Sequence, residues 1–80
     1  MADETAERTR KVIAAVLKVP PDRVTPKAHL VRELGMESIQ SIELIAALEE
    51  EFSTEIDADK IGDVLTVEKA IAFMQQAVGK

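Results

Sequence analysis

The apolar residues near the start of the chain follow the spacing of one face of an α-helix. These positions are Val12, Ile13, Val16 and Leu17. The pattern predicts a helix from about Asp3 or Thr5 to Leu17, with one of these two polar residues as its N-cap. Pro20 and Pro21 end the pattern, because proline cannot continue the backbone hydrogen bonding of a helix.

A long segment without helical periodicity follows, with the sequence PPDRVTPKAHLVRELGM. Its apolar side chains are spaced along it as anchors that could pin it to the core, and they are Val24, Leu30, Val31 and Leu34. A loop of this length in so short a chain is usually functional or strapped down. We therefore expect residues 20–36 to form a long loop that is held against the core.

The segment from Ser38 to Glu51 or Phe52 has the strongest helical character, because it is dominated by the good helix formers Ala, Leu, Glu and Gln. With about 100° between successive residues, one face gathers the core stripe Leu44, Ile45, Leu48 and Phe52. The opposite face mixes aliphatic with acidic residues: Ile39, Ile42 and Ala46 with Glu43, Glu49 and Glu50. The segment is therefore predicted to be a helix with one buried face and one outward face.

The outward face has the character of an interaction site, since an exposed apolar strip rimmed by like charges is typical of one. The alternative is that Ile39 lies under the long loop. Positions 33–59 hold nine acidic residues and no basic residue. This region would repel nucleic acid and anionic membranes and attract a basic protein surface, although acidic residues also serve simply to keep a helix soluble.

A third helix is predicted from about Thr66, a plausible cap, to Ala77. Its apolar stripe consists of Val67, Ala70, Ile71, Met74 and Val78. The connection before it, STEIDADKIGDVL, is expected to hold one turn of helix near residues 59–64, with Gly62 at its end. No segment shows a convincing strand alternation. The sequence thus predicts an all-α protein, a single domain over residues 1–80 that forms a three- to four-helix bundle with a long loop between the first two helices.

Composition excludes several classes of function. The chain has no Cys, and so no disulfide, thiolate metal site or thiol nucleophile, and with two Phe and no Trp or Tyr it lacks stacking platforms for single-stranded nucleic acid. No apolar run matches a membrane-spanning helix or a signal peptide. The only His, His29, has no clear nucleophile–base pair, which argues against an enzyme. We expect a cytoplasmic monomer that binds no nucleic acid and does not insert into a membrane.

Ser38 stands where a glycine-containing loop gives way to the helix over residues 38–52. One interpretation is an N-cap, without a full capping box because the residue three positions later is Ser41 rather than Glu or Gln. The other is a phosphate ester, since a helix N-terminus offers unpaired amides and a positive dipole end to an anion. Ser41 falls on the core side and Ser53 lies past the helix end. Ser38 is therefore the serine best placed to hold an anion in solvent.

The stretch VRELGMESIQSIELIAALEEEFSTEI resembles the acyl carrier protein family. It looks like the family's pattern of D-S-L, preceded by a leucine–glycine turn and followed by E-L and L-E-E-x-F. The resemblance continues into ADKIGDVLTVEKAIAFM and more loosely back through KVIAAVLKVPPDRVTPKAHLV, so it covers nearly the whole chain. Its most specific part is LEEEFSTEI.

The resemblance implies a non-catalytic carrier in which Ser38 bears 4′-phosphopantetheine, added from coenzyme A by a phosphopantetheinyl transferase. Acyl intermediates would be carried as thioesters on the thiol of this arm, which reconciles a carrier function with the absence of Cys. The other implied partners are acyl-loading, condensing and acyl-transfer enzymes with basic docking surfaces. The expected partner-binding residues are Glu37, Ile39, Ile42, Glu43, Ala46, Glu49 and Glu50. Independently of the resemblance, a small bundle rich in alanine (Ala14, Ala15, Ala46, Ala47 and Ala70 among others) could open a slot between helices for an acyl chain.

Three positions depart from the family pattern. Glu37 stands in place of the usual aspartate before the serine, Ile39 in place of the leucine after it, and Ala46 in place of a frequent methionine. The region corresponding to the family's acidic third helix is also diluted, with Lys60 and Gly62 inside DADKIGDV. Among fatty acid, polyketide and specialised lipid or secondary pathways, these changes favour a specialised one. The alternative function is an unmodified interaction module that uses the outward face of residues 38–52, with Ser38 only a cap.

Overall fold

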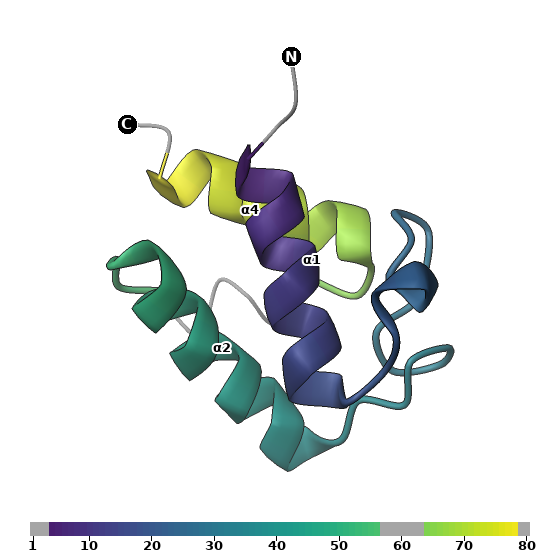
Figure 1. The fold of residues 1–80 in the computed structure, drawn as a ribbon. Helices are drawn as coiled ribbons and strands as arrows, with labels where there is room; N and C mark the ends of the chain where they lie inside the picture. The colour runs from purple at the N-terminus through teal and green to yellow at the C-terminus, as the bar shows by residue number, and fades with distance from the viewer. Residues whose placement is uncertain (1–3, 57–63, 79–80) are drawn as a thin grey trace.

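The computed structural model describes residues 4–56 and 64–78, and within these ranges it contains three α-helices. They are α1 (Glu4–Leu17), α2 (Ser38–Phe52) and α4 (Val67–Val78), and a 3₁₀ helix, η1 (Pro21–Arg23), lies between α1 and α2. α1 crosses the front of the molecule in Figure 1 and packs against both α2 and α4. The all-α prediction is confirmed. The turn of helix expected near residues 59–64, with Gly62 at its end, lies outside the described residues apart from Val64.

α1 begins and buries its side chains much as its periodicity predicts. It starts at Glu4, so Thr5 is its second residue rather than its N-cap, and Asp3 lies outside the described residues. Its buried residues are Thr9, Ile13, Ala14 and Leu17, while Val12 and Val16 pack at the edge of the core. The Thr9 hydroxyl is fully buried and has no hydrogen-bond partner among the described residues. A polar group inside this stripe was not expected.

The end of α1 is set by a left-handed residue ahead of the prolines. Lys18 has φ = 58°, and the next amide, that of Val19, donates a 3.1 Å hydrogen bond to the carbonyl of Ala14. Bonds of this kind close the last turn of many helices. Pro20 follows in extended conformation and Pro21 opens η1. The helix therefore ends at the predicted residue, Leu17. The left-handed conformation of Lys18 changes the direction of the chain two residues before Pro20.

The long loop is strapped to the start of α4. The amide of Leu30 donates to the carbonyl of Leu65 at 2.8 Å, and the amide of Val67 donates to the carbonyl of Ala28 at 3.1 Å. The first amides of a helix have no partner within the helix. The bond to Ala28 supplies one for Val67, the first residue of α4, and the bond to Leu65 holds the segment just before it. The side chain of Thr66 adds a cap, as predicted, because its Oγ1 accepts from the amide of Lys69 at 3.4 Å.

Three of the four predicted loop anchors are buried: Val24, Leu30 and Leu34. Val31 was expected to be a fourth, and this is wrong, because it is 48% exposed. Residues 29–35 form a helical turn in which the amide of Gly35 donates to the carbonyl of Val31 at 3.0 Å. In such a turn, residues four apart share a face, so Leu30 and Leu34 point inward together and Val31 points out.

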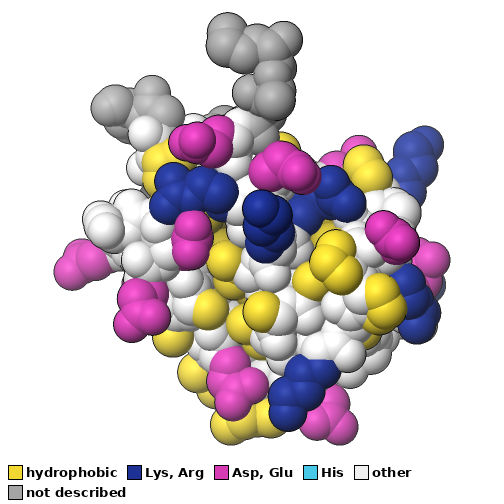
Figure 2. Space-filling model, viewed as in Figure 1, with side chains coloured by type: hydrophobic (Ala, Val, Ile, Leu, Met, Phe, Trp, Pro, Cys, Tyr) yellow, Lys and Arg dark blue, Asp and Glu magenta, His cyan; other side chains and the backbone are white. Residues whose placement is uncertain are grey.

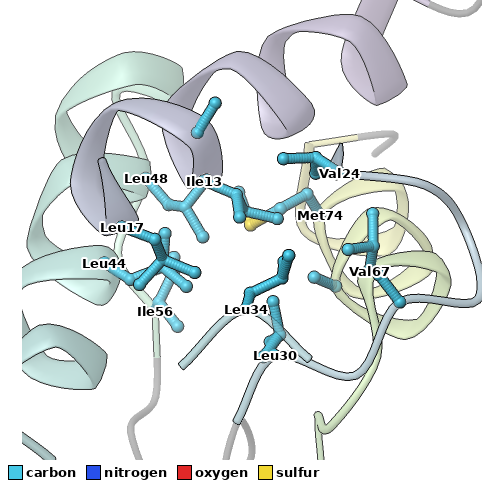
Figure 3. Close-up of a cluster of buried hydrophobic side chains, with 13 residues drawn as sticks. Ile13, Leu17, Val24, Leu30, Leu34, Leu44, Leu48, Ile56, Val67 and Met74 are labelled. Atoms are coloured by element: carbon cyan, nitrogen blue, oxygen red, sulfur yellow. The ribbon is translucent and has the colours of Figure 1, made fainter. Parts of the chain in front are cut away.

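The core gathers side chains from all three helices and the loop. In Figure 3, Ile13 and Met74 lie between Leu17, Leu44 and Ile56 on the left and Val24 and Val67 on the right. Of the core stripe predicted for α2, Leu44 and Leu48 are buried, and Ile45 and Phe52 pack at its edge. The guanidinium of Arg8 lies over the ring of Phe52, 4.5 Å from its centroid, and covers the open side of this residue.

Candidate functional site

The start of α2 is organised by Glu37 and Gln40. Glu37 is the N-cap, with extended backbone (φ −95°, ψ 165°), and its carbonyl accepts the first helical bond from the amide of Ser41 at 3.0 Å. Its own amide donates to Oε1 of Gln40 at 2.9 Å. The Glu37 carboxylate faces the Gln40 amide in return, which completes a capping box. The interpretation of Ser38 as the cap without a box is therefore corrected: the box lies one residue earlier.

Ser38 is the first residue of α2, and its side chain is exposed. Because Glu37 caps the helix, the Ser38 hydroxyl is not needed for that purpose, and no hydrogen bond from it is found within residues 4–56 and 64–78. The carbonyl of Ser38 accepts a 2.6 Å hydrogen bond from the hydroxyl of Ser41. Ser38 thus presents an uncommitted hydroxyl to solvent at the positive end of a helix.

The other two serines of the region are less suited to carry a bulky anion. Ser41 is partly buried, and its hydroxyl is engaged with the carbonyl of Ser38. Ser53 is the C-cap of α2 in left-handed conformation (φ 52°), so a phosphate there would meet the negative end of the helix. Of the three serines, Ser38 alone combines an exposed side chain with a place at the positive end of α2.

A pocket of about 510 Å³ opens beside Ser38 and runs toward the core. Its wall on α2 includes Ser41, Ile45 and Leu48, and the facing wall is formed by the loop, the segment before α4 and α4 itself. The residues on that facing wall are Leu30, Val31, Met36, Val64, Leu65 and Ala70. Of the alanines expected to open a slot, only Ala70 lines this pocket. The lining is therefore mostly aliphatic, with Glu37 and the two serines as its polar members.

The outward face of α2 is exposed as predicted. Ile39 and Ile42 are 60% and 64% accessible, which rules out the alternative that Ile39 lies under the loop. Glu43, Ala46 and Glu50 are exposed beside them. Figure 2 shows hydrophobic and acidic side chains next to one another at the lower left, over α2, while most Lys and Arg side chains lie higher, toward α1. The face therefore combines large aliphatic side chains with negative charge.

Two acidic residues of α2 have structural contacts that the helical wheel did not reveal. The carboxylate of Glu49 is partly buried and accepts a 2.7 Å hydrogen bond from the amide of Ile56, which ties the chain after α2 back onto the helix. Glu51 is bound by Arg8 of α1 through a 2.8 Å ion pair and through a further hydrogen bond to its carbonyl. Among the acidic residues expected to bind partners, Glu37, Glu43 and Glu50 are exposed, and Glu49 is partly buried.

His29 serves the backbone of the loop. Its Nδ1 accepts hydrogen bonds from the amides of Val31 and Arg32, at 3.2 and 3.0 Å. Its own amide donates to Oε1 of Glu33 at 2.8 Å. These bonds stabilise the turn that leads to Ser38. No cluster of His, Asp and Glu able to hold a metal ion occurs among the residues that the structure describes.

Two comparisons with known proteins bear on this site. A family model described as "Phosphopantetheine attachment site" matches residues 7–74. The acyl carrier protein of Phenylobacterium zucineum (strain HLK1) is 38% identical over 76 residues, which is 95% of this chain and 96% of that protein. The chain therefore belongs to the acyl carrier protein family.

Membership of this family settles the general mode of action. Its members are carriers rather than catalysts, their prosthetic group is covalent 4′-phosphopantetheine, and they interact with synthase and transferase enzymes. No helix within residues 4–56 and 64–78 is long and apolar enough to cross a membrane. The expectations of a carrier, of its prosthetic group and of a non-catalytic protein are confirmed.

Proposed function

We propose that Ser38 is the attachment residue for 4′-phosphopantetheine. In the transfer, a bond forms between Oγ of Ser38 and the phosphorus next to the pantetheine, the pyrophosphate bond of coenzyme A breaks, and adenosine 3′,5′-bisphosphate leaves. The hydroxyl proton passes to the transferase or to solvent. The observation that carries the proposal is the position of Ser38: exposed, uncommitted, and at both the N-terminus of α2 and the mouth of the apolar pocket. The product is a phosphodiester on Ser38.

The pocket beside Ser38 supports an apolar acyl chain as the cargo. A chain on the arm can fold back into the pocket, where each buried CH₂ contributes about 0.8 kcal/mol. The wall residues Leu30, Leu48 and Ala70 are buried and carry no polar side-chain atoms. Ser41 adds a hydroxyl near the mouth, where the polar end of the arm would lie.

The outward face of α2 is proposed as the docking surface for partner enzymes. Ile39 and Ile42 supply exposed aliphatic surface, and Glu43 and Glu50 supply charge that complements basic patches on a transferase and on acyl-loading, condensing and acyl-transfer enzymes. Glu37 extends the surface at the start of α2, and Ala46 lies on it between Glu43 and Glu50. Glu49 contributes through its charge while its carboxylate also holds the amide of Ile56.

The pathway is proposed to be a specialised lipid, polyketide or other secondary pathway rather than primary fatty acid synthesis. Glu37, Ile39 and Ala46 stand at positions next to Ser38 or on the docking face, where a change of shape alters which enzymes bind. We place this carrier in the cytoplasm as a monomer. The exposed apolar face also suits an unmodified interaction module, and the experiment below separates the two functions.

The test is co-expression with a phosphopantetheinyl transferase of broad specificity, followed by intact-mass measurement. The wild-type chain should gain the mass of one phosphopantetheinyl group, and Ser38→Ala should gain none. Ser53→Ala, the matched change at the other end of α2, should be modified like the wild type. An unmodified wild-type chain would favour the interaction module, and modification that survives Ser38→Ala would assign the arm to another residue.

A further inference from the structure

Three hydrogen bonds fix the backbone on both sides of Ser38. The amide of Glu37 donates to Oε1 of Gln40 at 2.9 Å, and the carbonyl of Glu37 accepts from the amide of Ser41 at 3.0 Å. The carbonyl of Ser38 accepts from the Ser41 hydroxyl at 2.6 Å. The peptide groups before Glu37, before Ser38 and after Ser38 are therefore each held by an acceptor or donor in the first turn of α2.

Of this set, the bond from Gln40 reaches farthest back, to the peptide group that joins Met36 to Glu37. Gly35 has φ = 73°, a conformation that turns the backbone sharply, and the segment from Gly35 to Glu37 has no regular structure. The amide of Met36 is held at its far end by the carbonyl of Leu30 at 2.9 Å. At the end of the segment next to α2, the Gln40 side chain accepts the hydrogen bond from the Glu37 amide. This bond holds the direction in which the chain enters the helix.

From this arrangement we infer that Gln40 is a positioning residue for the modification of Ser38. Its side chain holds Glu37 in the geometry of an N-cap and thereby keeps Ser38 in the first helical position, with its Cβ direction fixed toward solvent. Gln40 does not contact the reagent and acts through Glu37. The inference rests on the proposed function of Ser38, and it names the feature that presents the serine to a transferase.

A serine held in one orientation reacts faster, because its hydroxyl is correctly placed in a larger fraction of the complexes with the transferase. When the box is lost, the first turn of α2 frays, and Ser38 leaves the helical geometry for part of the time. The rate of transfer falls with the fraction of molecules that hold the serine correctly. Removing a cap of this kind typically shifts the equilibrium between the formed and the frayed turn by roughly threefold to tenfold, and this factor sets the upper limit of the fall in rate.

The experiment compares Gln40→Met, which keeps the length of the side chain but loses the acceptor, with Gln40→Glu, which keeps an acceptor. Thr66→Ala is the matched control, because it removes the side-chain cap of α4 and leaves α2 intact. Each purified chain is the varied substrate of one phosphopantetheinyl transferase with coenzyme A. Hydrogen exchange of the Glu37 amide is measured by NMR to report the bond to Gln40 directly.

Gln40→Met should lower kcat by up to about tenfold, keep KM for the carrier within about twofold because Ile42 and Glu43 are unchanged, and speed exchange of the Glu37 amide. Gln40→Glu should restore most of kcat, and Thr66→Ala should match the wild type. Wild-type kcat in Gln40→Met, equal losses in Gln40→Met and Gln40→Glu, or an equal loss in Thr66→Ala would overturn the inference. Failure of the wild-type chain to accept the group would instead overturn the proposed function, so the two results are distinct.

Discussion

The amide of Leu30 donates a 2.8 Å hydrogen bond to the carbonyl of Leu65, and both residues line the pocket beside Ser38. This bond joins the loop before α2 to the segment before α4, two parts of the chain that are far apart in sequence. The wall opposite α2 is thereby fixed by backbone contacts rather than by side chains alone. One wall of the pocket is the helix α2, and the other is a loop held by backbone hydrogen bonds. Such a pocket can keep its shape when a prosthetic group is attached to Ser38.

The pocket predicts how acyl cargo changes the stability of the carrier. With longer saturated chains on the arm, the melting temperature should rise stepwise until the pocket is filled, because each buried CH₂ adds about 0.8 kcal/mol. Ala70→Leu places a larger side chain on the buried wall and should remove most of this gain, and Ala72→Leu on the exposed side of α4 should not. Thermal unfolding of the acylated forms checks this. A gain that is equal in all three chains would mean that the cargo lies elsewhere.

Charge reversal should separate docking from folding on α2. Glu43→Lys places a positive charge on the exposed face and should raise KM for the transferase roughly threefold to tenfold at low salt, with a smaller effect at high salt. Thermal stability should stay near that of the wild type, because no hydrogen bond or ion pair of Glu43 is found among the described residues. Glu55→Lys, an equal change beyond the helix, is the control. Unchanged kinetics for Glu43→Lys at low salt would remove this residue from the docking surface.

Glu49→Lys is expected to behave differently from Glu43→Lys. The carboxylate of Glu49 holds the amide of Ile56 at 2.7 Å, and this bond is lost in the variant. A hydrogen bond to a charged group contributes about 1.5–3 kcal/mol, so the variant should lose stability as well as affinity. The residue is therefore a poor choice for testing docking alone, although its position on the helical wheel suggested otherwise.

His29 should prove important for stability through its ring nitrogen. His29→Ala removes the acceptor for the amides of Val31 and Arg32 and should lower the free energy of unfolding by about 1–2 kcal/mol. His29→Asn should recover much of this loss, because an asparagine side chain accepts from the amide two residues later in turns of this kind. Denaturant unfolding of the two variants measures the difference. Equal stability of the alanine and asparagine variants would show that the ring acts by packing.

Thr9 offers a stabilising substitution. Its hydroxyl is fully buried without a partner in the described part of the chain, and an unsatisfied buried hydroxyl costs about 1–3 kcal/mol. Thr9→Val keeps the shape of the side chain and should raise the free energy of unfolding by about 1 kcal/mol, or the melting temperature by about 4–8 °C. Thr25→Val, at an exposed loop position, should bring no comparable gain. A loss of stability in Thr9→Val would point to a hydrogen bond that the hydroxyl makes in solution.

The three helices and the two faces of α2 could be predicted because they depend on local periodicity. Leu44 and Leu48 were assigned to the core and Ile42 to the surface from their spacing alone, and their burial agrees. Val31 was misassigned because its direction depends on the turn that His29 organises, and loop geometry of this kind leaves no periodic trace. Thr9 lies four residues before Ile13, at the spacing of the buried face of α1, but the stripe was drawn from apolar residues alone and so left it out.

The capping of α2 was misassigned by one residue although its signal was present. Ser38 matches the usual preference for serine at an N-cap, whereas Glu37 does not. Gln40, three residues after Glu37, is the partner that a capping box needs, and it could have been found by testing each residue before the helix in turn. The position of the cap matters for the proposed function. Because Glu37 caps α2, the Ser38 hydroxyl is not needed as a cap and is available for modification.

Localisation of the prosthetic group on the chain tests the central proposal most directly. The absence of Lys and Arg between Arg32 and Lys60 means that trypsin releases one peptide, residues 33–60, that holds Ser38, Ser41 and Ser53 together. Fragmentation of this peptide from the modified protein, by a method that keeps the phosphodiester intact, identifies the residue that carries the arm. We predict that the whole of the added mass lies on Ser38. Fragments that place it on Ser41 or Ser53, or a peptide without added mass, would contradict the proposal.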